Sequence, residues 1–421
     1  MKKIIWLISL VTFTFFFTSC WDYTEYEQMA QIYSLGIDLD IRTKEVTVTL
    51  QFIPITKSSG EKSAEINRGT VYSASDATIM GAITKLQQAS TNKLFYGYIQ
   101  VLVIGEDAAK YIMKDIVEHF ERTPNTRNSI GIVIVPGKAE GVIATRDPNS
   151  VTSSGKKIRM FLNSYQSNGS TYLVTLRDFL QMMTRQGYEP VAPKIITTSL
   201  VDDPGEATGG EKNGIRFAVE KKGNLMAGGM AVFKKDKLVG WLNNKETMGL
   251  NWILGNKINA FKVTDRGDVK LSDGNTDRLS IHDELKKTLY FYITKSGRKV
   301  KVRIENNKPV VYLDIKIEAA LRKYYSVGGD EYIDPEIVGS LGKKLESSIY
   351  SDVTAALKKG KDELNSDIFG FGFNFYRQHP KVWHKYYEKA WESEFSSIPV
   401  RVNIKVKVNN TGTNIKKFFI K

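Results

Sequence analysis

The chain of 421 residues contains a single cysteine, Cys20. It therefore cannot form an internal disulfide, and zinc or iron–sulfur centres built on several thiolates are excluded. Stability must come from packing, and a composition of 42% hydrophobic and 25% charged residues is typical of a folded protein. A chain of this length is enough for about two to four domains.

The residues before Cys20 have the features of an export signal. Lys2 and Lys3 form a positive start, residues 4–17 form an apolar run, and two small polar residues precede the cysteine. We interpret residues 1–19 as a lipoprotein signal peptide and Cys20 as the lipidation site, which places the chain on the cell membrane. An ordinary secretory peptide is one alternative. A transmembrane anchor fits less well, because a span needs about 20 apolar residues.

The chain is basic, with a formal net charge of +14. A basic protein held at a lipid surface would face anionic headgroups or wall polymers. Nucleic acid is the competing partner for such a charge, but the export signal removes the chain from the cytoplasm. We therefore expect a membrane contact and no nucleic acid.

Residues 20–200 alternate between strand and helix patterns and predict an N-terminal mixed α/β domain. Asp76 is expected to cap one helix, and Asp107 is expected to open a single helix that ends before Pro124. Further helix is expected within residues 162–179. The apolar or alternating runs that predict strands are residues 35–40, 46–52, 99–104 and 130–135.

Residues 201–284 predict a middle domain that begins with a linker. Residues 201–214 contain many helix and strand breakers and no apolar period. A hairpin is expected over residues 231–242, where two apolar runs flank a lysine-rich turn, and a short helix over residues 246–254.

Residues 285–421 predict a C-terminal domain with an antiparallel sheet backed by helices. Strict alternation of apolar residues with Lys or Arg leaves one face of the sheet buried and a basic face in water. Asp334 is expected to cap a long backing helix whose apolar stripe runs from Val338 to Leu364. The alternating segments are residues 300–304, 313–317 and 400–408. The fold class is therefore α+β, with three consecutive mixed α/β domains.

We find no catalytic or metal-binding motif in the sequence, and we expect neither an enzyme nor a cofactor. His379 and His384 are five residues apart across a proline, a spacing that does not place two imidazoles on one helical face. Asp38 and Asp40 could share a strand face, but no third group accompanies them, so we expect both to face solvent. Asp202 lies in a turn that lacks the spacing of a calcium loop.

An aromatic run follows Asp367. Phe369 and Phe373 fall at helical spacing with Tyr376, which predicts that they pack in the core beneath the long helix. The alternative is contact with a partner or a membrane, because the glycines between the aromatic residues would let another backbone approach closely. The candidates for that contact are Phe371 and Phe375.

Several ordered motifs of this chain resemble the Ger(x)C family, the lipoprotein C subunits of nutrient germinant receptors in endospore-forming bacteria. The similarity runs over nearly the whole chain after the signal peptide. Phe17 before the cysteine and Tyr98 in the first domain depart from the usual pattern of the family. The motifs that carry the resemblance lie at residues 19–25, 36–38, 96–106, 120–124, 190–193, 229–246, 367–372 and 380–395.

The resemblance implies three mixed α/β domains in a row, no enzymatic activity and no cofactor. It also implies assembly with two integral-membrane partners, the A and B subunits, on the outer face of the inner membrane of the spore. The nutrient pocket of such receptors is generally placed in the B subunit, so this chain would support signalling in the germination response.

Two other classes of protein are alternatives. A solute-binding lipoprotein of a membrane transporter would have two similar βαβ lobes around a hinge, whereas the pattern after residue 215 changes to hairpins and alternating strands. A wall-directed hydrolase would need paired acids or a metal set in a cleft, and no such spacing occurs.

Overall fold

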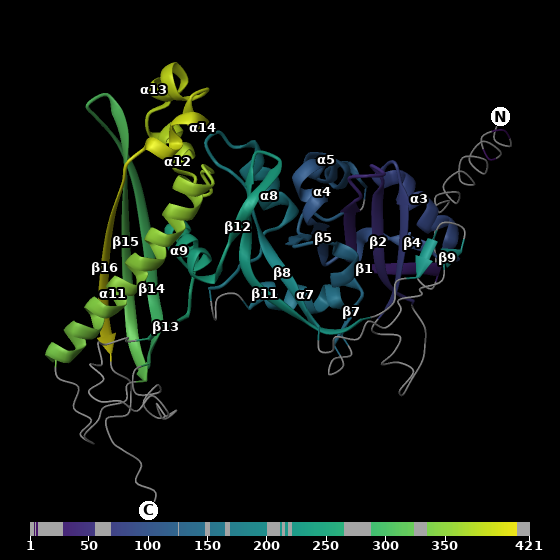
Figure 1. Cartoon of the computed structure of the whole chain (residues 1–421), viewed down its shortest axis with the longest axis horizontal. Coiled ribbons are helices and arrows are strands. Elements are labelled where there is room, and N and C mark those ends of the chain that lie inside the picture. Colours follow the sequence, from purple (N-terminus) through teal and green to yellow (C-terminus); the bar gives the residue numbers. More distant parts are fainter. Residues whose placement is uncertain are drawn as a thin grey trace, which may run out of the picture.

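The computed structural model describes most of the chain in two layered parts that lie side by side along the longest axis (Figure 1). Cys20, the signal peptide apart from residues 4 and 6, most of the expected linker, Asp202 and Asp334 lie outside the described residues. The longer described segments are residues 28–54, 69–124, 126–147, 152–164, 169–199, 221–264, 288–323 and 335–410, with short pieces at 211–212 and 215–217. Within these segments the strands form one 12-stranded and one 4-stranded sheet.

The larger sheet is mixed, with its main strands in the order β12-β11-β8-β6-β5-β1-β2-β3-β10-β9. Strand β1 (Met29–Leu39) pairs in parallel with β5 (Val101–Gly105) and antiparallel with β2 (Val46–Pro54). Strand β5 in turn pairs in parallel with β6 (Gly131–Val135), and every residue of β5 and β6 is buried. Continuous apolar runs suit these central strands because helices cover both of their faces. The remaining strands are β3 (Thr70–Asp76), β4 (Lys93–Phe95), β7 (Thr145–Arg146), β8 (Val191–Ser199), β9 (Glu211–Lys212), β10 (Ile215–Phe217), β11 (Lys221–Lys234) and β12 (Lys237–Leu242).

Alternate side chains of the central strands supply two separate cores. On β5, Leu102 and Ile104 join the core beneath α3 (Ile79–Ala89), α4 (Glu106–Tyr111), α5 (Met113–Arg122) and α8 (Leu176–Thr184). Val101 and Val103 point to the other face, beneath α6 (Ala139–Ile143) and α7 (Ser154–Asn163). The layered α/β arrangement expected for the first part of the chain is confirmed.

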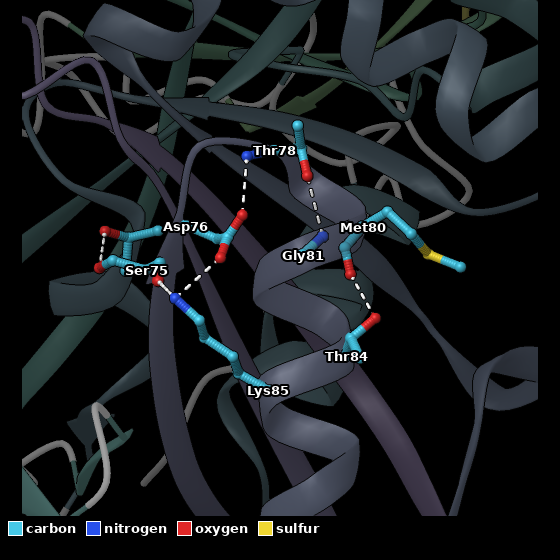
Figure 2. Close-up of polar contacts among 8 residues, drawn as sticks. Ser75, Asp76, Thr78, Met80, Gly81, Thr84 and Lys85 are labelled. Carbon is cyan, nitrogen blue, oxygen red and sulfur yellow. Dashed lines mark hydrogen bonds and ion pairs between the residues drawn. The ribbon is translucent and has the colours of Figure 1, made fainter.

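Two expected helix boundaries are wrong in detail. Asp76 still belongs to β3, and Thr78 is the N-cap of α3, with its Oγ1 accepting from the Gly81 amide at 3.0 Å (Figure 2). The single helix expected after Asp107 is divided at Ile112, where φ is −129°. Local apolar spacing does not report this break, because the residues on both sides of it face the same core.

Hydrogen-bonded pairing continues across the expected boundary at residue 200. Strand β8 pairs antiparallel with β11, and β11 forms the expected hairpin with β12. The short helix expected after this hairpin is confirmed as α9 (Asn244–Leu254). The division of the chain into three domains stays a prediction.

The smaller sheet has the order β13-β14-β15-β16. Strands β13 (Ala260–Thr264), β14 (Thr288–Glu305) and β15 (Lys308–Lys323) are antiparallel, but β16 (Val400–Asn410) is parallel to β15. The expectation of a purely antiparallel sheet is therefore wrong at its last strand. Long helical segments separate β15 from β16, and such a crossover is what a parallel neighbour requires.

Helices α9 and α11 (Pro335–Leu357) cover one face of the smaller sheet (Figure 1). Leu345, Ile349 and Val353 of α11 are fully buried, as the apolar stripe predicts. The chain then forms a helical cap of short helices over one end of this sheet, and β16 follows it. These are η4 (Lys358–Glu363), α12 (Phe371–Gln378), α13 (Pro380–Val382), η5 (Trp383–Tyr387), α14 (Trp391–Glu394) and η6 (Phe395–Ser397). The mixed α/β class predicted from the sequence is confirmed.

Candidate functional site

Asp38 is a buried structural residue, and the expectation that it faces solvent is wrong. Its carboxylate accepts hydrogen bonds from the amides of Ala139 at 2.7 Å and Glu140 at 3.0 Å, at the start of α6. Burial raises the pKa of Asp38 to about 6, although these amides oppose the rise. A side chain at Gly105 would collide with the Asp38 carboxylate, so the two motif residues fit together. Asp40 remains near the surface, where it accepts from the Arg42 amide at 2.8 Å.

The aromatic run does not present Phe371 and Phe375 to a partner. Both side chains are 0% exposed, so the expected partner contact through them does not fit this structure. Phe369 is also buried, as expected, but Phe373 is only half-buried and lies between the guanidinium groups of Arg185 and Arg377.

The position at which α12 begins explains why Phe375 is buried and Phe373 is only half-buried. Gly370 adopts a left-handed φ of 68°, and α12 begins only after it, so Phe369 and Phe373 do not share a helix. Within α12 the buried aromatic residues are Phe371 and Phe375.

Asp367 fixes this turn. Its carboxylate accepts from the amides of Phe371 at 3.0 Å and Gly372 at 2.7 Å, and from Trp391 Nε1 at 3.0 Å. Burial raises the pKa of Asp367 to about 6. Gly372 has no room for a side chain, because a Cβ would lie 2.5 Å from Trp391 Nε1 and 2.7 Å from the Cα of Gly187. The motif that begins at Asp367 therefore packs closely against the Gly187 region and Trp391, and we call this contact the joint.

The joint connects the helical cap to the loop between α8 and β8. The Phe373 amide donates to the carbonyl of Gly187 at 2.9 Å, and the Glu189 amide donates to the carbonyl of Asp367 at 3.0 Å. Gln186 accepts from Trp383 Nε1 at 2.9 Å. These bonds hold the smaller sheet and its cap against the larger sheet.

An apolar groove opens on the surface between α3 and α5. Its first hollow has a volume of about 590 Å³, and it adjoins a second of about 500 Å³. Met80 and Tyr111 are each 61% exposed here, and Ile41 is 52% exposed. We call this the α3–α5 groove and define it by Leu39, Asp40, Ile41, Lys44, Met80, Ile83, Tyr96, Tyr111, Ile112, Asp115, Glu118, His119, Phe120, Arg122 and Pro124. Sequence reasoning missed it, because its exposed apolar residues are isolated in the sequence.

The groove has a fixed wall and a charged rim with three carboxylates and two basic groups. Lys85 forms an ion pair with Asp76 at 2.8 Å and donates to the Ser75 carbonyl, which ties α3 to β3, while Met80 points away from this pair (Figure 2). Asp40 and Asp115 line the first hollow with Lys44, and Asp115 and Glu118 line the second with Arg122. Burial lowers the pKa of His119 in the same hollow, because desolvation disfavours the charged imidazolium.

The outer face of the smaller sheet carries the second surface of note. Alternation along β14, β15 and β16 places apolar side chains against α11 and basic side chains on the other face, as the sequence predicts. A hollow of about 720 Å³ lies over these strands. We call this surface the basic face and define it by Lys295, Lys299, Lys301, Lys316, Arg401, Lys405 and Lys407, all exposed.

The described residues contain no group of three or more His, Cys, Asp or Glu side chains that could hold a metal ion. His379 contacts the carbonyl of Val302 at 2.8 Å, and His384 pairs with Glu388 at 3.0 Å. In the part of the chain that the structure describes, no helix is both long and apolar enough to span a membrane.

Comparison with known proteins identifies the family. A family model described as "Spore germination protein N-terminal domain" matches residues 22–197, and one described as "Spore germination B3/ GerAC like, C-terminal" matches residues 228–412. Spore germination protein KC of Bacillus subtilis (strain 168) is 24% identical over 409 residues, covering 93% of this chain and 92% of its own length. Spore germination protein B3 of the same organism is 22% identical over 402 residues, covering 94% of each chain.

A solved structure titled "Crystal Structure of the GerBC protein" matches with a TM-score of 0.48 and 18% sequence identity, covering 89% of this chain and 96% of that chain. The two family models together span most of the chain, and the relatives match it almost from end to end. The chain belongs to the Ger(x)C family of spore germination proteins.

Proposed function

We propose that the chain is a non-catalytic, lipid-anchored subunit of a nutrient germinant receptor. Its partners are two integral-membrane subunits, of the A and B type, and its place is the outer face of the inner membrane of the spore. Family membership over nearly the whole chain supports a role in germination. The buried carboxylates of Asp38 and Asp367 cap helices, which supports a structural role for the motifs that contain them.

The acyl chains on Cys20 would hold the larger sheet near the membrane. Strand β1 begins at Met29, nine positions after Cys20, so the connecting segment spans at most about 30 Å. Each buried CH₂ of a lipid chain contributes about 0.8 kcal/mol, and stable anchoring needs more than one chain. Cys20→Ala should therefore abolish incorporation of radiolabelled palmitate. Equal labelling of this variant would contradict the lipid anchor.

The α3–α5 groove is the observation that supports docking of a membrane subunit. An exposed apolar groove between two helices suits the apolar face of an amphipathic helix. Because Asp40 and Asp115 line it, we assign to it a helix of a membrane subunit that carries Lys or Arg beside its apolar face.

The groove can be tested by a matched pair of substitutions. Met80→Asp places a charge among the apolar contacts of the groove, whereas Met160→Asp makes the same change at an equally exposed methionine on α7. We expect Met80→Asp to lose co-purification with the two membrane subunits, while the melting temperature of the purified mature domain stays unchanged. Met160→Asp should keep both properties.

Two results would contradict this docking site. Full co-purification of Met80→Asp would show that the partner helix binds elsewhere. An equal loss for Met160→Asp would show that the assay reports added charge and not the groove. A solute-binding lipoprotein would have two similar lobes, and the two sheets here differ in both size and strand order.

A further inference from the structure

The basic face has an excess of positive charge that its own carboxylates do not balance. In one row across β14, β15 and β16, Gly297 is followed by Lys316 and Lys405 as Cα partners. Like charges on neighbouring strands are unfavourable. Glu318 already pairs with Lys295 at 3.7 Å, and Asp314 accepts from Asn403 Nδ2 at 2.8 Å.

Most lysines of this face are free to bind an anion. Among the described residues no ion pair involves Lys299, Lys301, Lys316, Lys405 or Lys407. All five side chains are exposed, and together they occupy four neighbouring rows of the sheet, with Lys316 and Lys405 in the same row. Neighbouring strands are about 4.8 Å apart, and alternate residues along a strand are about 6.8 Å apart. The lysines therefore form a broad layer of charge and not a pocket for a single ion.

A glycine shapes the surface at the centre of this layer. A Cβ at Gly297 would have no atom within 4 Å, so the position opens directly into the hollow of about 720 Å³. Lys316 stands beside it on β15. The hollow is thus wide enough to admit small phosphate-bearing groups between the lysine side chains.

We infer that the basic face binds the anionic surface of a phospholipid membrane, through phosphate groups of the lipid heads. A spread of lysines suits a surface of many charges, and each lysine near such a surface strengthens binding by about fivefold, equivalent to about 1 kcal/mol. A nucleic-acid surface would also present aromatic rings for stacking between its basic residues. Among the rows that carry the free lysines the aromatic residue is Tyr312, which is covered by Arg303 and Arg401, whereas the exposed Tyr290 and Tyr292 lie farther along β14, beyond the row of Lys295.

This contact goes beyond the lipid anchor, because it needs no acyl chain on Cys20. With an anchor before β1 and a basic face on the smaller sheet, the larger part of the molecule and the smaller sheet would each have their own contact with the membrane. Binding would then restrict the orientation of the chain on the membrane as well as its distance from it.

The test uses the full mature chain with Cys20→Ala, so that no acyl chain contributes. Its co-sedimentation with vesicles of phosphatidylglycerol and phosphatidylcholine is compared with vesicles of phosphatidylcholine alone. The variant Lys316→Glu/Lys405→Glu/Lys407→Glu should weaken binding to the anionic vesicles by more than about tenfold. Binding should also fall steeply as the Debye length shrinks from about 10 Å at 0.1 M salt to about 3 Å at 1 M.

The control variant is Lys237→Glu/Lys358→Glu/Lys389→Glu, which makes the same change in net charge at exposed lysines outside the basic face. It should bind nearly as well as the parent, and circular dichroism should show that all three proteins are folded. An equal loss in both variants, or no preference for anionic vesicles, would overturn the proposal.

Competition with inorganic phosphate distinguishes two possible ligands of the basic face, free phosphate and the phosphate groups of lipid heads. If millimolar phosphate abolishes vesicle binding at constant ionic strength, the hollow is a site for a free anion and the membrane assignment is wrong. If phosphate competes only as well as chloride, the membrane assignment is supported. A negative result for vesicle binding would not contradict the Cys20 anchor, because that anchor is measured separately by palmitate labelling.

Discussion

Phe375 should be one of the most costly residues to truncate in the helical cap. Its ring lies 5.6 Å from Trp383, 5.1 Å from Tyr387 and 5.9 Å from Trp391, measured between centroids, and no part of the side chain is exposed. Removing a buried phenylalanine costs about 3–5 kcal/mol, because the contacts are lost and a cavity remains. For a cooperative unit of about 150–250 residues, this lowers the melting temperature by about 6–20 °C.

Phe373→Ala is the matched control within the same helix. Its ring is half-buried and rests between Arg185 and Arg377, contacts worth about 0.5–1 kcal/mol each. We expect a cost of about 1–2 kcal/mol, and therefore a clearly smaller fall in melting temperature.

Thermal unfolding followed by circular dichroism, with urea midpoints as a second measure, compares the two variants. The reasoning would be refuted if Phe373→Ala were as destabilising as Phe375→Ala. It would also be refuted if Phe375→Ala left the melting temperature unchanged, because a partner-facing residue would behave in that way.

Three further variants test the buried carboxyl group on α11 and the packing of the joint. Burial raises the pKa of Asp352 to about 7 from an ordinary value of 3.8. The folded state then binds a proton more tightly than the unfolded state, so this residue lowers stability as pH rises from about 4 to about 7. Asp352→Asn should reduce the decrease in urea midpoint over this pH range. Superimposable pH profiles of the urea midpoint for the variant and the parent would contradict this expectation. Gly372→Ala should destabilise the chain, because its Cβ would lie 2.5 Å from Trp391 Nε1, whereas Gly339→Ala in open space on α11 should stabilise it by about 0.5–1 kcal/mol. Equal melting temperatures for these two variants would show that the close approach at Gly372 is not rigid.

The elements that the sequence predicts well are those with strong local patterns. The apolar runs of β5 and β6, the hairpin of β11 and β12 and the stripe of α11 are all confirmed. Alternation also predicts the basic face, because a strand that buries one side must expose the other.

What the sequence does not predict depends on partners that are distant along the chain. Asp38 is buried because its carboxylate caps a helix about a hundred positions later, and β16 is parallel to β15 because a helical crossover returns it to the same side. Because α12 begins only after the left-handed turn at Gly370, Phe375 lies in the core, where the sequence predicts Phe373. The α3–α5 groove forms only when Met80 and Tyr111, on separate helices, come together.

Recovery of the chain from spore membranes tests the proposed receptor assembly most directly. A tagged chain would be purified from detergent-solubilised inner membranes of dormant spores, and the proteins that accompany it would be identified and quantified. The account predicts that two integral-membrane subunits, of the A and B type, are recovered with it in a constant ratio that survives a second purification step. Recovery of the chain alone, or its presence only in the soluble fraction, would contradict the account.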